Sequence, residues 1–355
     1  MSYLFAILLF SFLIFIHELG HFTAAKIFGV QVNEFSLFMG PAIFQKKFGQ
    51  TVYSIRCIPI GGFCAMEGED AEEPSDNPHA FPNAVWWEKS IILVAGAFMN
   101  FVAGVILMAV FFAPDKQFII PVVSEADPKC YFAGEQGIQA GDRLVSVDGE
   151  PIYVSSDFNM ILSLKGGETH DLVVERNGKK VTLKNLDMRK QDFPNEDGTV
   201  SQRYGFSFTI QEATLPAKLR YTWNSSIDCV RMVRLSLQML LSGQAGVKDV
   251  SGPVGIVQQM ATVADESSSA YYAFLNLIYF GGFIAINLAV MNMLPIPALD
   301  GGRVVGVLLT AAYEGVTKKK PNPKIEGYIH GAGMVLLMIL MVLLLFKDII
   351  FAIKG

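Results

Sequence analysis

Four long apolar stretches limit what this chain can fold into. Each is close to the ~20 residues that a helix needs to cross a lipid bilayer. They cover Tyr3–Ala25, Ile91–Ala113, Tyr271–Leu294 and Gly331–Ile353. Of all residues 52% are hydrophobic, which is too many for an ordinary soluble protein. We therefore predict an α-helical membrane protein with four transmembrane helices.

Charged residues around these stretches predict their orientation. The first stretch has no Lys or Arg before Lys26, so it lacks the basic start of a signal peptide and is expected to be retained. Basic residues concentrate in cytoplasmic loops, so Lys26 and the run 318–320 place the ends of the first and third stretches in the cytoplasm. The N-terminus and the soluble segment after the second stretch then lie outside the cytoplasm, and we expect the cell inner membrane. Because Lys347 and Asp348 interrupt the fourth stretch, a tilted or partly interfacial helix is the alternative there.

Charge and cysteine content exclude other classes of protein. The net charge is −5 and the chain has no long basic run, so nucleic acid is not an expected partner. The four cysteines show neither C-x-x-C spacing nor the density of a disulfide framework. They predict neither a structural zinc site nor a disulfide scaffold.

The first apolar stretch contains a polar cluster, HELGH, at residues 17–21. His17 and His21 are four residues apart, so on a helix they share one face and can bind a single ion. Glu18 is turned by about 100° from His17 and can reach a water on that ion. Ionisable groups in a membrane helix are costly and usually mark a function, which favours a zinc ion here. A hydrated, idle cluster at the membrane interface is the alternative.

A catalytic zinc takes three protein ligands, so a third must come from elsewhere in the chain. The best candidate is Asp300 in NMLPIPALDGGR, residues 292–303, at the end of the third stretch. Pro295 and Pro297 cannot continue a regular helix, and irregular backbone at membrane depth is tolerated only beside protein or a watery cavity. A cap for a helix that begins near Gly302 is the alternative role for Asp300. Weaker ligand candidates are Glu34, Glu67 and His330.

These two motifs resemble those of the site-2 proteases, zinc metalloproteases that cleave proteins within the membrane. HELGH is similar to the family's zinc motif, and NMLPIPALDG (292–301) to its N-x-x-P-x-P-x-L-D-G motif. The resemblance covers nearly the whole chain and is greatest to the bacterial, regulator-of-sigma-E-protease-like branch with a single PDZ domain. It implies that Asp300 is the third zinc ligand and that Asn292 assists substrate or oxyanion binding.

Three further segments resemble signatures of this family. PIGGF looks like its membrane re-entrant β-hairpin, which implies that Gly61, Gly62 and Phe63 hold the unwound substrate at the edge of a strand. AGAFMNF (95–101) resembles the start of the second helix, although the family usually has Pro in place of Ala97. SGPVGI, at residues 251–256, resembles another signature whose chemical role the sequence does not reveal.

The segment outside the cytoplasm supports the same branch. GEQGIQAGDRLVSVDGEPI (134–152) resembles the PDZ signature, with a tight hairpin turn expected at Asp148 and Gly149. RYGFSFTI (203–210) alternates like a strand, and residues 215–241 are typical of a helix lying on a membrane face. A PDZ groove binds an extended peptide at a sheet edge, and a lid that only excludes bulky substrates is an equal alternative.

These features predict an intramembrane zinc endopeptidase that cuts transmembrane segments of other membrane proteins, with its active site near the cytoplasmic side. The resemblance suggests anti-sigma factors or remnant signal peptides as substrates. A membrane scaffold with a structural metal is the competing hypothesis, but it has no need of a base at Glu18; a transporter would need polar residues through several helices. The expected domains are 1–113 with the zinc motif and hairpin, 114–212 with the PDZ domain, 213–260 with the peripheral helix and SGPVGI loop, and 261–355 with the last two transmembrane helices.

Overall fold

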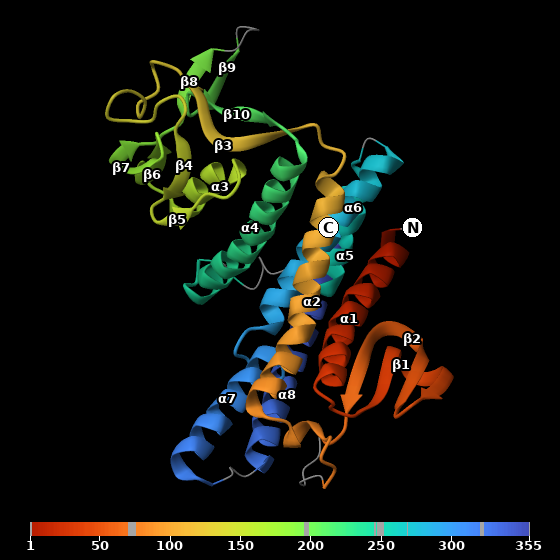
Figure 1. The fold of residues 1–355 in the computed structure, drawn as a ribbon. Coiled ribbons are helices and arrows are strands. Elements are labelled where there is room, and N and C mark those ends of the chain that lie inside the picture. Colours follow the sequence, from red (N-terminus) through yellow and green to blue (C-terminus); the bar gives the residue numbers. More distant parts are fainter. Residues whose placement is uncertain are drawn as a thin grey trace. The chain divides into compact units, whose positions relative to one another are not determined.

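The structure, a computed structural model, describes residues 2–69, 76–194, 199–244, 246, 252–267, 269–319 and 323–354. Residues 70–75 of the acidic stretch 67–78 and Ser251 of the SGPVGI segment lie outside these residues. The chain forms two compact units (Figure 1). One comprises residues 1–111 and 229–355, and the other residues 112–228. The two units are groups of residues in mutual contact and differ from the four domains expected from the sequence. Those domain bounds stay a prediction.

Four helices of the first unit are long and apolar enough to cross a membrane, as the sequence predicts. They are α1 (Ser2–Ile27), α2 (Trp86–Phe112), α6 (Ala270–Asn292) and α8 (Pro323–Lys354). The short 3₁₀ helix η1 (Phe81–Asn83) precedes α2. The protein is therefore a multi-pass membrane protein.

Helix α8 runs through Lys347 and Asp348 without a break, because the Asp348 carboxylate has partners. It accepts hydrogen bonds from the backbone N–H groups of Gly252 at 3.3 Å and Gly255 at 2.8 Å. These residues flank the start of α5 (Pro253–Asp265), so Asp348 satisfies N–H groups that the helix cannot. A Cβ on Gly252 would lie 2.6 Å from Asp348 Oδ2. Within the described residues, the SGPVGI segment thus docks α5 on α8.

Strands β1 (Val32–Phe48) and β2 (Thr51–Met66) form an antiparallel hairpin in which each strand bends and contributes two segments. Residues 32–37 pair with residues 62–66 on one side and with residues 52–55 on the other. The order of segments across this small sheet is 42–48, 51–56, 32–37 and 62–66. The segment from Gly62 to Met66 is therefore an edge strand, with one side free of strand partners among the described residues.

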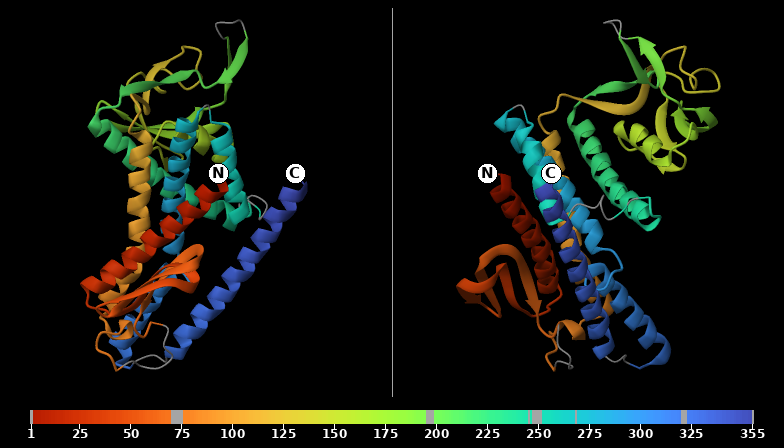
Figure 2. Two further views of the ribbon diagram at one scale, coloured as in Figure 1. Left: turned by 90° about the vertical axis from the view of Figure 1, so that its right-hand side faces the viewer. Right: turned by 180° about the vertical axis from the view of Figure 1, so that it is seen from behind.

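The hairpin lies along α1 (Figures 1 and 2). Ser11 of α1 donates a hydrogen bond from its buried hydroxyl to the carbonyl oxygen of Pro59 at 2.9 Å. Apolar residues of α1, the hairpin and α2 form one buried cluster, which includes Ala25, Phe35 and Ile92. This packing fixes the edge strand beside the helix that carries HELGH.

After α6 ends at Asn292, the backbone is irregular until α7 (Asp300–Thr317) begins, as the prolines predict. Ala298 adopts a φ of +78°, and its N–H donates a hydrogen bond to Nδ1 of His330 on α8 at 3.2 Å. A Cβ on Gly333 of α8 would lie 2.4 Å from the Pro297 side chain. Helix α8 thus packs closely against the loop that precedes Asp300.

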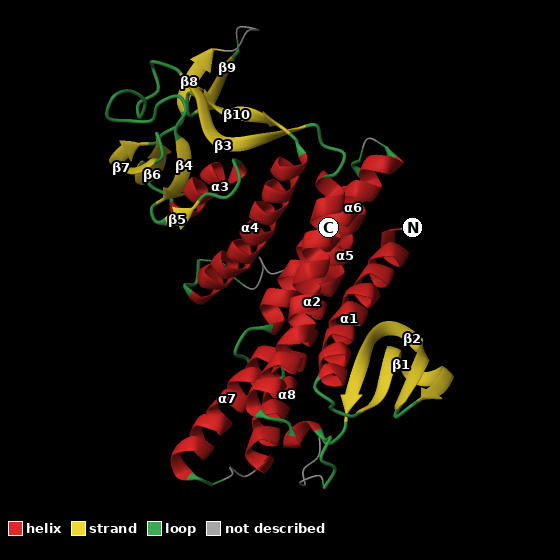
Figure 3. Ribbon diagram, in the orientation of Figure 1, coloured by secondary structure: helices red, strands yellow, loops and turns green. Residues whose placement is uncertain are grey.

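The second unit, residues 112–228, contains an antiparallel sheet and the helix α3 (Ser156–Lys165) (Figure 3). The sheet order is β10-β3-β4-β6-β7, with β5 paired to β4. The strands are β3 (Gln117–Ala126), β4 (Arg143–Val147), β5 (Glu150–Pro151), β6 (Thr169–Arg176), β7 (Lys179–Asp187) and β10 (Phe206–Glu212). A separate pair consists of β8 (Gln191–Pro194) and β9 (Val200–Arg203), and α4 (Leu215–Leu241) follows the sheet.

Two turns decide the layout of this unit. Asp148 and Gly149 have φ values of +47° and +79°, so the hairpin between β4 and β5 has the tight turn that the sequence predicts. The expectation of one strand over residues 203–210 is wrong. β9 ends at Arg203 and β10 begins at Phe206, because Gly205 adopts a φ of +79° and its Cα packs against Phe193.

Candidate metal centre

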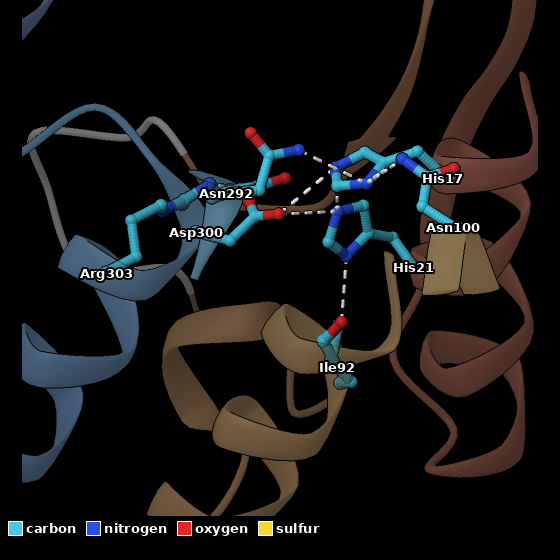
Figure 4. Close-up of polar contacts among 8 residues, drawn as sticks. His17, His21, Ile92, Asn100, Asn292, Asp300 and Arg303 are labelled. Carbon is cyan, nitrogen blue, oxygen red and sulfur yellow. Dashed lines mark hydrogen bonds and ion pairs between the residues drawn. The ribbon is translucent and has the colours of Figure 1, made fainter. Parts of the chain in front are cut away.

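Three side chains from two distant parts of the chain converge in the first unit (Figure 4). One ligand atom from each of His17, His21 and Asp300 lies within 4.8 Å of the other two. Asp300 Oδ2 is 3.0 Å from His17 Nε2 and 3.5 Å from His21 Nε2. The two Nε2 atoms are 3.1 Å apart. HELGH is helical, so the histidines share a face of α1, and the loop between α6 and α7 brings Asp300, the first residue of α7, to that face.

These spacings fit a tetrahedral zinc ion. With bonds of about 2.0–2.2 Å to nitrogen and oxygen, neighbouring ligand atoms of such an ion are about 3.3 Å apart. The three side chains are nearly buried, with exposed fractions of 11% for His17, 9% for His21 and 17% for Asp300. Asp300 Oδ2 is fully buried and accepts no hydrogen bond. A buried carboxylate oxygen in this state is costly, and a cation would satisfy it.

Backbone from α2 orients His21. Its Nδ1 lies 2.8 Å from the carbonyl oxygen of Ile92, which can only accept a hydrogen bond. The ring proton of the neutral imidazole is therefore on Nδ1, and Nε2 keeps a free lone pair directed at the other two ligand atoms. Metal-binding histidines usually have such a partner at the second nitrogen.

Two amide side chains face the other histidine. The amide nitrogens of Asn100 on α2 and Asn292 on α6 lie 3.4 Å and 3.5 Å from His17 Nδ1. Asn100 Oδ1 is buried without a hydrogen-bond partner. Turning the Asn100 amide by half a rotation brings this oxygen to His17 Nδ1, where it can accept a hydrogen bond from the Nδ1–H group.

Glycines let α1 and α2 approach each other closely at the site. A Cβ on Gly20 would lie 2.3 Å from the carbonyl oxygen of Ala95. A Cβ on Gly96 would lie 2.4 Å from His21 Nε2 and 2.8 Å from His17 Cε1. No real Cβ occupies such a position, so the geometry of the histidine pair depends on glycine here. Small residues have this role in many membrane helix pairs.

The edge strand of the hairpin passes beside Glu18, the acidic residue of HELGH. An ideal Cβ on Gly62 would lie 3.8 Å from Glu18 Cγ. Phe63, the next residue, pairs with Ser36 in the register of the sheet, and the guanidinium of Arg56 lies 5.0 Å from the centre of its ring. Gly61 has a φ of +82°, which bends the chain as it enters this strand.

The weaker ligand candidates have other partners. Glu34 forms an ion pair with Arg56 at 2.7 Å, and Glu67 accepts a hydrogen bond from Asn33. His330 receives the N–H of Ala298, so it supports the loop before Asp300. Asp300 is the first residue of α7 and makes no side-chain cap, because the N-cap residue is Leu299.

Sequence reasoning missed the groups that orient the histidines. Asn100 lies in the AGAFMNF segment, which the sequence analysis noted without giving this residue a role. An amide inside a long apolar helix is a signal that could have found it, because buried amides need partners. The carbonyl of Ile92 leaves no signal in a sequence, since every residue has one.

Comparison with known proteins agrees with this geometry. The family model described as peptidase family M50 matches residues 5–340. A protein of Clostridium perfringens named as a zinc metalloprotease is 36% identical over 360 residues, covering 99% of this chain and 100% of that protein. One of Clostridium acetobutylicum with the same type of name is 35% identical, covering 98% and 97%. The regulator of sigma-W protease RasP of Bacillus subtilis is 26% identical, covering 97% of both chains.

Four apolar helices around a buried cluster of two histidines and one aspartate define the class, an intramembrane metalloprotease. The chain belongs to peptidase family M50, the site-2 proteases. It is an intramembrane zinc endopeptidase, of the kind that acts in regulated intramembrane proteolysis.

Proposed function

We propose that His17, His21 and Asp300 hold the catalytic zinc and that Glu18 is the general base. The observation that carries this proposal is the convergence of three ligand atoms within 4.8 Å, one of them a buried oxygen without a hydrogen bond. Asp300 comes from a segment more than 250 residues away from the histidines, so local sequence alone does not bring it there. The Glu18→Gln variant, discussed below, tests the division of roles.

Zinc, when bound, supplies Lewis-acid activation of a water and of the scissile carbonyl. Glu18 takes a proton from the attacking water and passes it to the leaving amine. Glu18 therefore has to alternate between the carboxylate and the protonated carboxyl during one catalytic cycle. Its place beside Gly62, and not within the ligand cluster, supports that function.

The amides complete the polar surroundings in this proposal. With its amide turned, Asn100 fixes the His17 ring by accepting a hydrogen bond from the Nδ1–H group, which leaves Nε2 for the metal. Asn292, at the end of α6 and 3.5 Å from the same ring, assists the substrate carbonyl when the oxyanion develops. The two amides near the same imidazole thus have different proposed tasks, one on the His17 ring and the other on the substrate.

The close helix contact at Gly96 gives a prediction about metal binding. Gly96→Ala inserts a methyl group between the histidine rings, so we expect zinc affinity to fall by about 10- to 100-fold, as when support for a ligand is lost. Zinc competition with a chelator dye measures the affinity. Gly104→Ala is the control, because its Cβ would meet Ile286 at 2.6 Å on the same helix, away from the histidines. Equal zinc affinity in both variants contradicts the prediction.

A peptide bond in a helix is a poor protease substrate, because its carbonyl is already hydrogen-bonded and its backbone is shielded. Adding the substrate as a new strand to the edge formed by Gly61, Gly62 and Phe63 holds it extended. This edge is free of strand partners in the described residues and passes Glu18. We include in the proposal that the hairpin enters the membrane, where the substrate helix unwinds.

Photo-crosslinking tests this assignment of the edge. In the Glu18→Gln background, p-benzoylphenylalanine in place of Phe63 is expected to crosslink to the transmembrane segment of a substrate. The matched control is the same replacement at Phe44, an exposed residue of the opposite edge segment 42–48. Crosslinking is measured by the shift of the substrate on a gel. An equal or stronger yield at Phe44 would contradict binding at the edge near Gly62.

The second unit is proposed to be the PDZ domain. Strand β10 is the last in its sheet, and among the strands that the structure describes it pairs with β3 alone. The Phe158 ring of α3 lies 5.2 Å from that of Phe206 on β10. A free edge next to a helix is the arrangement in which a PDZ groove adds a peptide strand. A lid that excludes bulky substrates needs no such edge, so the free edge favours peptide binding.

The proposed substrates are transmembrane proteins of the cell inner membrane, with the PDZ domain outside the cytoplasm and the zinc near the cytoplasmic side. The name of RasP in Bacillus subtilis, regulator of sigma-W protease, supports anti-sigma factors as one class. Remnant signal peptides are a second class of short membrane segment. Comparing membrane proteomes of cells with the wild-type chain and with Glu18→Gln identifies the substrates, which accumulate only in the variant.

A further inference from the structure

The second unit has a partly open cavity that neither the zinc chemistry nor the proposed peptide edge uses. It has a volume of about 100 Å³ and lies among β3, β4, β10 and the first half of α4. Its walls are apolar on the side of Phe118 and Tyr221, whose rings stack at 4.2 Å. This volume exceeds the roughly 10–15 Å³ that one water needs on the same measure, so the cavity can hold a small polar group.

Two arginines are among the residues that line this cavity, the half-buried Arg143 on β4 and the exposed Arg220 on α4. Neither has a hydrogen bond or an ion pair with any described residue. Glu175 is opposite Arg143 in the strand register, but the two form no ion pair. By contrast, Arg56 pairs with Glu34 at 2.7 Å and Arg176 with Asp142 at 2.6 Å. Two guanidinium groups without partners therefore lie at the same cavity.

The remaining polar groups of the lining suit an anion. Gln211 contributes an amide with no side-chain hydrogen bond to a described residue, and Asn224 donates to the carbonyl oxygen of Tyr153 at 3.2 Å. No Asp or Glu is among the lining residues of the described chain. Asp157, a buried neighbour, already accepts the N–H groups of Tyr153 and Val154. Arginine forks bind oxyanions with paired, charge-assisted hydrogen bonds.

The helix that carries Arg220 indicates where the anion comes from. Leu215, Leu219 and Trp223 are exposed by 70%, 61% and 53% and recur every four residues, so they form an apolar stripe on α4. At about 100° per residue, Arg220 lies between this stripe and the face that lines the cavity. Apolar side chains beside cationic ones are typical of helices that lie in a membrane interface. A lipid matches both surfaces, with its phosphate at the arginines and its glycerol and acyl chains along the stripe.

We propose that this cavity binds the phosphate of an anionic phospholipid headgroup. The proposal is independent of the zinc site and of the peptide edge at β10. It gives the second unit a lipid-binding role in addition to the proposed contact with peptides.

The test uses the full chain in a neutral detergent and a short-chain probe, dihexanoyl-phosphatidylglycerol, at concentrations at which the lipid is monomeric. Calorimetry or native mass spectrometry is expected to show one phosphatidylglycerol per chain. Arg143→Gln and Arg220→Gln should each raise its dissociation constant at least about tenfold, because each removes charge-assisted hydrogen bonds to the phosphate. Arg234→Gln is the matched control, with the same change of charge on α4, since Arg234 does not line the cavity. It should bind like the wild type.

Two further probes distinguish the sources of the oxyanion. Dihexanoyl-phosphatidylcholine should bind at least about tenfold more weakly, because its choline cancels the phosphate charge. Inorganic phosphate that binds as tightly as phosphatidylglycerol would overturn the assignment to a lipid. Equal affinity of the wild type and both glutamine variants would overturn the site itself. If a glutamine variant fails to fold, Arg143→Lys keeps the charge but loses the planar fork, and wild-type affinity in that variant counts against the proposal.

Discussion

Replacing Glu18 with glutamine is expected to lower the rate of intramembrane cleavage by at least about 100-fold while the protein keeps one zinc per chain. General acid–base catalysis contributes about 10²- to 10⁴-fold, and an amide cannot take a proton from water at neutral pH. Glutamine has the shape of glutamate, so His17, His21 and Asp300 keep their positions. The loss is therefore expected in the chemical step and not in metal binding.

Two measurements on the same purified protein check this result. Elemental analysis gives the zinc content, and cleavage of a reconstituted transmembrane substrate gives the rate. Glu88→Gln is a control for the loss of a carboxylate, because Glu88 is in the first turn of α2 and accepts the N–H of Val85. It should retain both zinc and activity. Loss of zinc in Glu18→Gln would make Glu18 a ligand, and full activity would remove it as the base.

Features that arise from local spacing could be predicted from the sequence. The four membrane helices follow from length and composition, and the structure has helices in all four stretches. The histidines of HELGH share a face because an α-helix repeats every 3.6 residues, whatever surrounds it. The turn at Asp148 and Gly149 was also predictable from local sequence, because both residues accept positive φ values.

Features that depend on tertiary contacts could not be predicted. The sequence of residues 51–66 does not indicate that residues 32–37 pair with two of its segments, 52–55 and 62–66. This double pairing makes Gly62 part of an edge strand. The role of SGPVGI depends on Asp348, which follows almost 100 residues later. The orientation of His21 depends on the backbone carbonyl of Ile92. The break at Gly205 has a tertiary cause as well, because the Phe193 ring leaves no space for a side chain there. Asp300 was a candidate ligand because the nearby prolines require a covered loop and because the motif resembles that of a family, and the structure brings it beside the two histidines.

The prediction for Asp300 follows from its unsatisfied oxygen. Asp300→Ala leaves His17 and His21 as the only ligands from the described cluster, so zinc affinity should fall by more than the about 10- to 100-fold that loss of a supporting partner costs. Cleavage should be lost with the metal. The two imidazoles, 3.1 Å apart, then have no anion between them, and excess zinc should restore little activity.

Asp348→Asn is the control that separates metal binding from the general effect of removing a buried charge. Asp348 is also a buried carboxylate of this unit, but its oxygens accept backbone N–H groups at the start of α5. An asparagine keeps one of these acceptors, so we expect a lower unfolding temperature with wild-type zinc affinity. Asp300→Ala should show the opposite pattern, because it removes a buried carboxylate oxygen that has no hydrogen bond and lies against the two imidazoles. Its zinc-free form should therefore unfold at an equal or higher temperature than the zinc-free wild type. Wild-type zinc affinity in Asp300→Ala would remove it as a ligand and leave the third position of the metal to a residue outside this cluster.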